Sequence, residues 1–105
     1  MYKVKFHQLV WEEDFKYLDP PVKVRTLKEC KEKLSISPKR FKSLQKKFKY
    51  YRRLRVGDYR AIYRIDEGHR RALVLKVGHR KDVYKHFAQR LKHVENGDEK
   101  IRGSF

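Results

Sequence analysis

Residues 51–63 read YRRLRVGDYRAIY, and this stretch decides the fold. Before Gly57-Asp58, Leu54 and Val56 alternate with arginines, and beyond that pair apolar and polar residues alternate again. A period of two is typical of a strand with one buried face, and a glycine-containing pair between two such runs is typical of a tight hairpin turn. The stretch therefore predicts a β-hairpin.

A third strand extends this hairpin. Strand-like runs occupy residues 49–56, 59–66 and 70–77, and Glu67-Gly68-His69 separates the second run from the third. Consecutive strands joined by short turns run antiparallel. The sequence therefore predicts an antiparallel meander of three strands.

The remaining elements are helices, apart from one short strand at 3–7 in which apolar residues alternate with lysines. Apolar residues recur at helical spacing over 8–18, 22–34 and 81–94. The prolines of Asp19-Pro20-Pro21 end the first of these segments, because proline is not tolerated inside a helix. Three helices are therefore predicted.

The order strand, two helices, three strands, helix predicts an α+β fold. We expect a small antiparallel sheet with the two amino-terminal helices packed on one face. Residues 39–47 show no clear period and are expected to form a basic loop, with Phe41 and Leu44 as anchors in the core. Residues 1–94 are expected to form one domain and residues 95–105 a flexible tail.

The composition excludes several classes of protein. A chain of 105 residues allows one compact domain with a modest core. The single cysteine, Cys30, excludes an internal disulfide and is expected to be a buried thiol in a reducing compartment. No run reaches the roughly 18 apolar residues of a membrane span, and the first residues do not resemble a signal peptide. We expect a cytoplasmic protein that does not contact membranes.

The net charge of +16 is concentrated in two segments. Residues 39–60 contain ten basic side chains and one acidic one, and residues 76–93 contain six and one. Such a focused positive field repels itself and attracts polyanions. The charge pattern therefore predicts a nucleic-acid partner.

Strand alternation gathers much of this charge on one face, because side chains two residues apart point to the same side. The apolar face, which the helices need to cover, is predicted to carry Leu54, Val56, Ala61, Tyr63, Ile65, Leu73, Leu75 and Val77. The opposite face is predicted to carry Arg53, Arg55, Arg60, Arg64 and Lys76. We expect this concave basic face to bind phosphates.

Two motifs resemble the RelE/ParE superfamily of toxin–antitoxin modules. They are residues 51–63 and residues 77–84, VGHRKDVY, joined by one further hairpin. Together with the order of elements, the resemblance covers about residues 1–92. It implies one of two activities. The RelE branch consists of ribosome-dependent endoribonucleases that cut messenger RNA in the ribosomal A site, whereas the ParE branch binds DNA gyrase.

The resemblance also implies a set of site residues. The RelE branch uses an arginine in the middle hairpin strand, basic residues on the strand before it, an arginine just after the last strand and a tyrosine on the following helix. In this sequence these positions match Arg60, Arg53 and Arg55, Arg80, and Tyr84. We predict that Arg60, Arg80 and Tyr84 are catalytic and that Arg53 and Arg55 bind phosphate. Some members carry lysines on the first hairpin strand, near the positions of Tyr51 and Arg53, and neither of these residues is a lysine here.

Further candidate site residues are suggested by the positive charge of lysines and by the pKa of histidine. Lys46, Lys47 and Lys76 are predicted to bind RNA phosphates. His79 is a candidate acid or base because the ordinary pKa of histidine lies near neutrality, although alternation directs it to the side opposite Arg80 and favours a structural role. The five histidines do not show the spacing of a metal site, so we expect no metal or other cofactor.

The sequence thus favours a metal-independent endoribonuclease that uses the RNA's own 2′-hydroxyl as nucleophile. The expected partners are the ribosome, messenger RNA and a cognate antitoxin with an acidic wrapping segment, which would form a hetero-oligomer with the toxin. Two alternatives stay open: a ParE-like inhibitor of DNA gyrase, and a non-catalytic RNA-binding domain with the same charge pattern.

Overall fold

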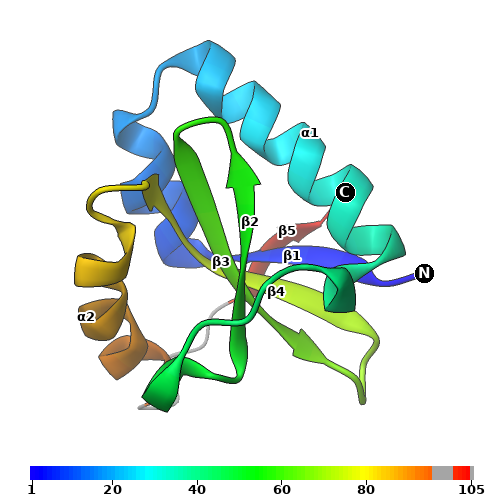
Figure 1. The fold of residues 1–105 in the computed structure, drawn as a ribbon. Coiled ribbons are helices and arrows are strands. Elements are labelled where there is room, and N and C mark those ends of the chain that lie inside the picture. The colour runs from blue at the N-terminus through cyan, green and yellow to red at the C-terminus, as the bar shows by residue number, and fades with distance from the viewer. Residues whose placement is uncertain (96–100, 105) are drawn as a thin grey trace.

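The computed structural model of this protein describes residues 1–95 and 101–104 (Figure 1). Its elements are β1 (Lys3–His7), η1 (Val10–Asp14), η2 (Phe15–Tyr17), α1 (Pro20–Ile36), η3 (Pro38–Arg40), η4 (Lys46–Phe48), β2 (Tyr51–Val56), β3 (Tyr59–Asp66), β4 (Arg71–His79), α2 (Val83–Glu95) and β5 (Ile101–Ser104). The α+β class is confirmed, and the strands and helices follow one another in the predicted order as far as α2.

The strands form one sheet in the order β2-β3-β4-β1-β5. The pairs β2–β3 and β3–β4 are antiparallel, as predicted. In contrast, β1 lies parallel to β4, so the sheet is mixed and not purely antiparallel. Alternation along a strand identifies its buried side but does not encode its direction relative to a strand that is distant in the sequence.

The carboxyl-terminal segment contains a strand that the sequence did not predict. β5 pairs antiparallel with the outer edge of β1, His7 facing Ile101. The rest of the expected flexible tail, residues 96–100 and 105, lies outside the described residues.

The first core lies between the sheet and the amino-terminal helices. Its buried members include Phe6, Val10, Phe15, Cys30, Leu34, Leu54, Val56, Ala61, Tyr63, Val74 and Val77. The hydroxyl of Tyr63 donates to the carbonyl of Pro38, which fixes the chain after α1 to β3. Burial raises the pKa of Tyr63, so this hydroxyl keeps its proton. The predicted positions of Cys30, Leu34, Leu54 and Ala61 in the core are confirmed.

The two amino-terminal helices differ in regularity. α1 begins with Pro20 and Pro21, which fit the first turn because the amide hydrogens of that turn have no partner inside the helix. The helix predicted at 8–18 is instead a π-helical turn, η1, followed by a 3₁₀ turn, η2. Val10 and Phe15 are buried as helical spacing predicts.

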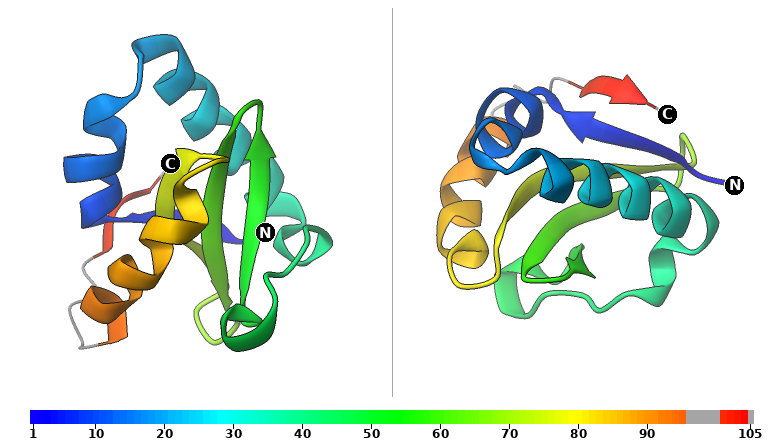
Figure 2. Two further views of the ribbon diagram at one scale, coloured as in Figure 1. Left: turned by 60° about the vertical axis from the view of Figure 1, so that its left-hand side comes forward. Right: turned by 90° about the horizontal axis from the view of Figure 1, so that it is seen from above.

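The second core lies on the opposite face of the sheet, which α2 covers. Figures 1 and 2 show α1 and α2 on different sides of the central strands. The apolar stripe of α2 packs there against three sheet residues. This core contains Val83, Phe87, Leu91 and Val94 of α2, Ile62, Leu73 and Leu75 of the sheet, and Leu44 of the basic loop. The face expected to be open and basic is therefore partly covered.

A bulge in the pairing of β3 with β4 explains why the second core was not predicted. Ile62 faces Lys76, whereas the next residue, Tyr63, faces Val74, so Leu75 is the extra residue. The alternation of β4 reverses at this point. Leu73 and Leu75 therefore lie under α2, and the expectation that they share the face of Val77 is wrong.

The helices of the described residues, 1–95 and 101–104, are short or polar. No helix there is both long enough and apolar enough to pass through a bilayer.

Candidate nucleic-acid interface

Arg53, Arg55 and Arg60 share one face of the sheet, as predicted. Arg53 lies opposite Ile62 and Arg55 lies opposite Arg60, and directly opposed residues of two strands point to the same side. Ile62 belongs to the core under α2, so the three arginines lie on that side of the sheet. Arg55 is exposed and the other two are half-buried. We call the set Arg53, Arg55 and Arg60 the arginine face.

Tyr84 lies in the first turn of α2 and contacts this face. The guanidinium carbon of Arg53 is 6.0 Å from the centre of the Tyr84 ring, at the limit of a cation–π contact. The start of α2 lies close to Gly78, which faces Arg60. A Cβ atom at Gly78 would lie 3.4 Å from the Cβ of Val83, the first residue of α2.

Arg60 is held at the β2–β3 turn. Its Nη1 donates to the carbonyl oxygens of Gly57 and Tyr59, each at 2.9 Å. Carbonyl acceptors orient a guanidinium group without neutralising its charge. Arg60 therefore keeps its full charge for an anion.

Arg80 follows β4 directly and lies beside the same turn. Its backbone N–H donates to the carbonyl of Asp58 at 2.8 Å. Its Nε is 3.7 Å from Oδ1 of Asp58, and the two side chains are 55% and 74% exposed. An exposed ion pair at this distance contributes little, so a phosphate can compete with Asp58 for Arg80. The turn thus brings Arg60 and Arg80 to one end of the sheet.

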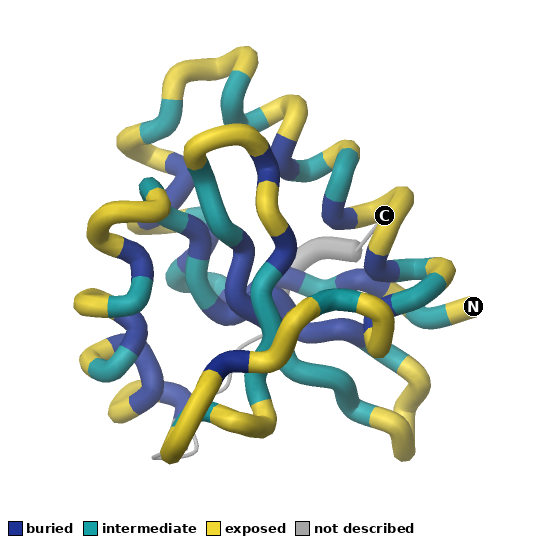
Figure 3. The backbone as a smooth tube through the Cα atoms, in the orientation of Figure 1, coloured by how far each residue is buried: buried dark blue, intermediate teal, exposed yellow. Residues whose placement is uncertain are grey.

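Lys46 and Lys47 lie in the short turn η4, within a mostly exposed segment between α1 and β2 (Figure 3). Lys46 has a φ of 56°, a left-handed conformation uncommon outside glycine. The Nζ of Lys47 is 5.2 Å from the ring centre of Phe48, which in turn packs edge-to-face against Phe87 of α2. Both lysines are exposed beside the second core, and phosphate binding by them stays a prediction.

Lys76 faces Ile62 and therefore starts from the same side of the sheet as the arginine face, as predicted, but its ammonium group is paired with an acidic residue. Its Nζ lies 2.9 Å from Oδ1 of Asp14, and its side chain is only 15% exposed. The positive charge of Lys76 is therefore paired with the carboxylate of Asp14 within the protein.

His79 is separated from the arginine face. It faces Tyr59 in the β3–β4 pairing, and the two rings meet edge-to-face at 5.5 Å. Since neighbours along a strand point to opposite sides, this pair lies on the other side of the sheet from Arg60. Nδ1 of His79 accepts the backbone N–H of Lys81 at 3.2 Å. This placement fits the structural role and does not support an acid or base beside the arginines.

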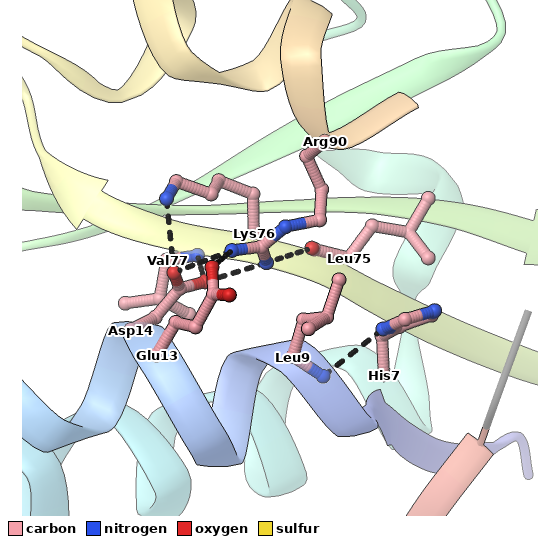
Figure 4. A network of polar contacts seen from close by, with 8 residues as sticks. All are labelled: His7, Leu9, Glu13, Asp14, Leu75, Lys76, Val77 and Arg90. Carbon is pink, nitrogen blue, oxygen red and sulfur yellow. Dashed lines mark hydrogen bonds and ion pairs between the residues drawn. The ribbon is translucent and has the colours of Figure 1, made fainter. Parts of the chain in front are cut away.

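The sequence did not reveal a buried ionic network that anchors α2 (Figure 4). Arg90 donates to both carboxylate oxygens of Asp14, at 3.0 and 2.9 Å, and to the carbonyl of Leu75 at 2.9 Å. Asp14 also accepts the N–H of Val77 at 2.8 Å and the ammonium group of Lys76. One carboxylate therefore connects η1, β4 and α2.

The network binds backbone groups of β4 where that strand has no neighbouring strand on the side of β1. The pairing of β1 with β4 ends at Phe6 and Val74, and Asp14 and Arg90 bind backbone groups of β4 beyond that point. One signal in the sequence points to it. Arg90 lies seven residues after Val83, within the apolar stripe of α2, where an apolar residue is expected. A charged side chain in such a position needs a buried partner.

The potential metal ligands among residues 1–95 and 101–104 do not form a cluster. No three histidine, cysteine, aspartate or glutamate side chains of these residues come together in a way that would hold a metal ion.

Comparisons with known proteins agree on the type of protein. The family model described as the ParE toxin of the type II toxin–antitoxin system parDE matches residues 6–84, which include both motifs noted in the sequence. Among solved structures, a chain of the RelBE2 toxin–antitoxin complex from Mycobacterium tuberculosis is similar, with a TM-score of 0.68 and 30% identity over 74% of this chain and 96% of that chain. A search of curated proteins finds no match. The chain therefore belongs to the ParE toxin family of type II toxin–antitoxin systems, within the RelE/ParE superfamily.

Proposed function

We propose that this toxin is a ribosome-dependent endoribonuclease that cleaves messenger RNA in the ribosomal A site. The observation that carries the proposal is the arginine face, with Tyr84 against Arg53 and with Arg80 at the same end of the sheet as Arg60. Guanidinium groups gathered on one face repel one another unless an anion lies between them, and they bind phosphate through paired donors. The likeness to a chain of the RelBE2 complex supports the RelE branch.

The proposed reaction takes its nucleophile from the RNA. The 2′-oxygen loses its proton and attacks the adjacent phosphorus, and the bond from phosphorus to the 5′-oxygen breaks. The departing oxygen takes up a proton. The products are a fragment with a 2′,3′-cyclic phosphate and a fragment with a 5′-hydroxyl. The protein's task is to align the attacking oxygen with the leaving oxygen and to stabilise the charge that develops on the phosphate.

The arginines divide this task by their positions. Arg60, oriented by two carbonyl groups, and Arg80, held by a weak and exchangeable ion pair, would bind the oxygens of the reacting phosphate. Arg53 and Arg55 would hold the neighbouring phosphates. Tyr84 would orient the reacting nucleotide through its ring or its hydroxyl.

The antitoxin is the proposed inhibitor of the toxin's activity. As a toxin of this family, the protein is expected to pair with a cognate antitoxin whose acidic segment folds onto the basic surface. Such a segment would cover the arginine face and exclude RNA from it. The complex would be a hetero-oligomer in the cytoplasm, where ribosomes are available to the released toxin.

Inhibition of DNA gyrase is the second candidate function. It is favoured by one observation, the match to the family model of ParE toxins over residues 6–84. Under this alternative the same basic surface would contact a protein–DNA complex instead of messenger RNA.

One experiment separates the two candidates. The toxin is expressed under tight control in cells that carry a reporter message in two forms, one translated and one without a start site, and the 5′ ends of both are mapped. New 5′ ends confined to the translated form support the proposal. Intact RNA together with broken DNA indicates the gyrase activity, and arrest with both nucleic acids intact indicates non-catalytic binding. Arg60→Ala should abolish the cuts, whereas Lys28→Ala, an equal loss of charge on the exposed side of α1, should retain them.

A further inference from the structure

A cavity of about 230 Å³ lies next to the arginine face, and its loop wall has no role in the reaction described above. Its walls are Lys42–Gln45 and Phe48 of the basic loop, together with Arg53 and Tyr84. Figure 1 shows the loop passing from the end of α1, across β2, to the side of α2. We call this cavity the base pocket.

The loop wall of the base pocket is held in place by the sheet. The N–H of Leu44 donates to the carbonyl of Tyr51 at 2.8 Å, and the N–H of Arg53 donates to the carbonyl of Lys42 at 3.0 Å. These bonds fix residues 42–44 along the edge of β2. The side chain of Leu44 is buried in the second core. The pocket is therefore pre-formed, which lowers the entropic cost of binding a ligand.

The far wall is equally well supported. The ring of Phe48 lies 5.4 Å from that of Phe87, and Phe87 is fully buried beneath α2. Tyr84 projects from the same helix and contacts Arg53 across the pocket. The two aromatic residues of the pocket thus rest on a fixed helix.

The chemistry of the lining is that of a nucleotide site. Phe48, Tyr84 and Leu44 provide apolar and aromatic surface, and the exposed amide of Gln45 provides both a donor and an acceptor. Lys42 and Arg53 add positive charge to the lining, and Lys46 and Lys47 precede Phe48 in the chain. The lining favours a planar ligand that has hydrogen-bonding edges and carries a negative charge.

We propose that the base pocket binds one unpaired nucleobase of the RNA, next to the phosphate that Arg53 holds. The inference rests on the proposed function, because it assumes RNA as the substrate. Stacking on aromatic side chains is the usual way in which proteins bind splayed-out bases of single strands. Gln45 reads the edge of the base, so the pocket gives cleavage a preference for particular nucleotides.

The test uses binding without cleavage. Short single-stranded RNAs made uncleavable by 2′-deoxy substitution are compared with the same RNAs lacking one base, the abasic position being moved along the strand. The affinity of the toxin for each RNA is measured by fluorescence anisotropy titration. At one position only, loss of the base should weaken binding by about 5- to 150-fold, which is the range expected for one stacked base. The salt dependence should not change, because no phosphate is lost.

Two variants distinguish the base pocket from general electrostatic attraction. Gln45→Ala should reduce the difference between intact and abasic RNA, and Tyr84→Ala should nearly abolish it. Lys28→Ala should weaken the binding of all RNAs alike and leave the difference unchanged. Equal binding of intact and abasic RNA at every position would overturn the proposal. If, in addition, Gln45→Ala weakens the binding of the antitoxin, the result shows that the pocket holds a protein side chain and not a base.

The failure of the base pocket can be distinguished from the failure of the proposed function. If binding depends on one base but translated messages stay intact, the base pocket stands and the nuclease activity fails. If translated messages are cut while abasic RNA binds as well as intact RNA, the nuclease stands and the base pocket fails.

Discussion

The guanidinium group of Arg90 and the carboxylate of Asp14 meet beneath α2 in a bidentate ion pair, with distances of 2.9 and 3.0 Å. The two side chains are only 4% and 1% exposed. Because α2 also carries Tyr84, this pair connects the stability of the fold to the geometry of the arginine face. The pair also joins η1 to the last helix.

Replacing one partner of this pair should be severely destabilising. Arg90→Leu leaves the buried carboxylate of Asp14 without its main partner, and breaking a buried pair in this way costs about 3–5 kcal/mol. Urea unfolding followed by circular dichroism measures the loss. Glu13→Gln is the matched control, because Glu13 contacts the same guanidinium group but is 61% exposed, and it should cost at most about 1 kcal/mol. Equal losses in the two variants would contradict the buried network.

Gly57 in the β2–β3 turn should not tolerate a side chain. Its φ is +60°, and forcing an L-residue into this region costs about 1–2 kcal/mol, so Gly57→Ala should lower the free energy of unfolding by that amount. Gly68→Ala is the comparison, because a Cβ at Gly68 meets its nearest neighbour at an ordinary 3.6 Å and should change stability by less than about 1 kcal/mol. Thermal unfolding compares the stability of the two variants, and Gly57→Ala should be the less stable one. A lower stability of Gly68→Ala would refute the turn geometry.

The thiol of Cys30 should be unreactive in the folded protein. Burial, assisted by the charge of Glu29, raises its pKa to about 12 from an ordinary 9.0. The thiolate is the reactive form, so a disulfide reagent at neutral pH should label the native protein very slowly and the denatured protein rapidly. The folded state holds the proton more tightly, so this group's contribution to stability is present below pH 9 and is lost as the pH rises toward 12. Rapid labelling of the native protein would show that Cys30 is not in the core.

Arg60 should contribute to the reaction through charge and paired donors together. By analogy with the removal of one transition-state hydrogen-bond donor, Arg60→Ala should lower the single-turnover rate by about 10²–10³-fold. Arg60→Lys should recover only part of this loss, because an ammonium group does not present the planar fork of a guanidinium group. Circular dichroism reports whether the variants remain folded. A full rate in Arg60→Ala would remove Arg60 from the site.

The local parts of the fold were predictable, because they depend on neighbours in the sequence. Alternation around Gly57-Asp58 identified the hairpin and the shared side of Arg53, Arg55 and Arg60. The bulge at Leu75 was not predictable, since one extra residue reverses the pattern without a signal of its own. The missed second core under α2, which contains Leu73 and Leu75, follows from that single irregularity. The ion pair of Lys76 with Asp14 was missed because it joins segments that are distant in the sequence.

The ionic network and the base pocket depend on contacts between distant segments. Asp14 and Arg90 are 76 residues apart, and only the unusual position of Arg90 in an apolar stripe hinted at the pair. The basic loop was recognised by its charge, and Leu44 was correctly predicted as an anchor. Phe48 and Gln45 line the same cavity as Tyr84. This could not be predicted, because it depends on the path of the loop, which sequence periodicity does not encode.

The most direct test of the account is cleavage of a defined message by the purified toxin, with and without ribosomes that hold this message in a known reading frame. We predict rapid cutting at the A-site codon on the ribosome, with a 2′,3′-cyclic phosphate on the upstream fragment, and little cutting of free RNA. The same message recovered intact from ribosomes treated with wild-type toxin, at concentrations that arrest growth, would contradict the account.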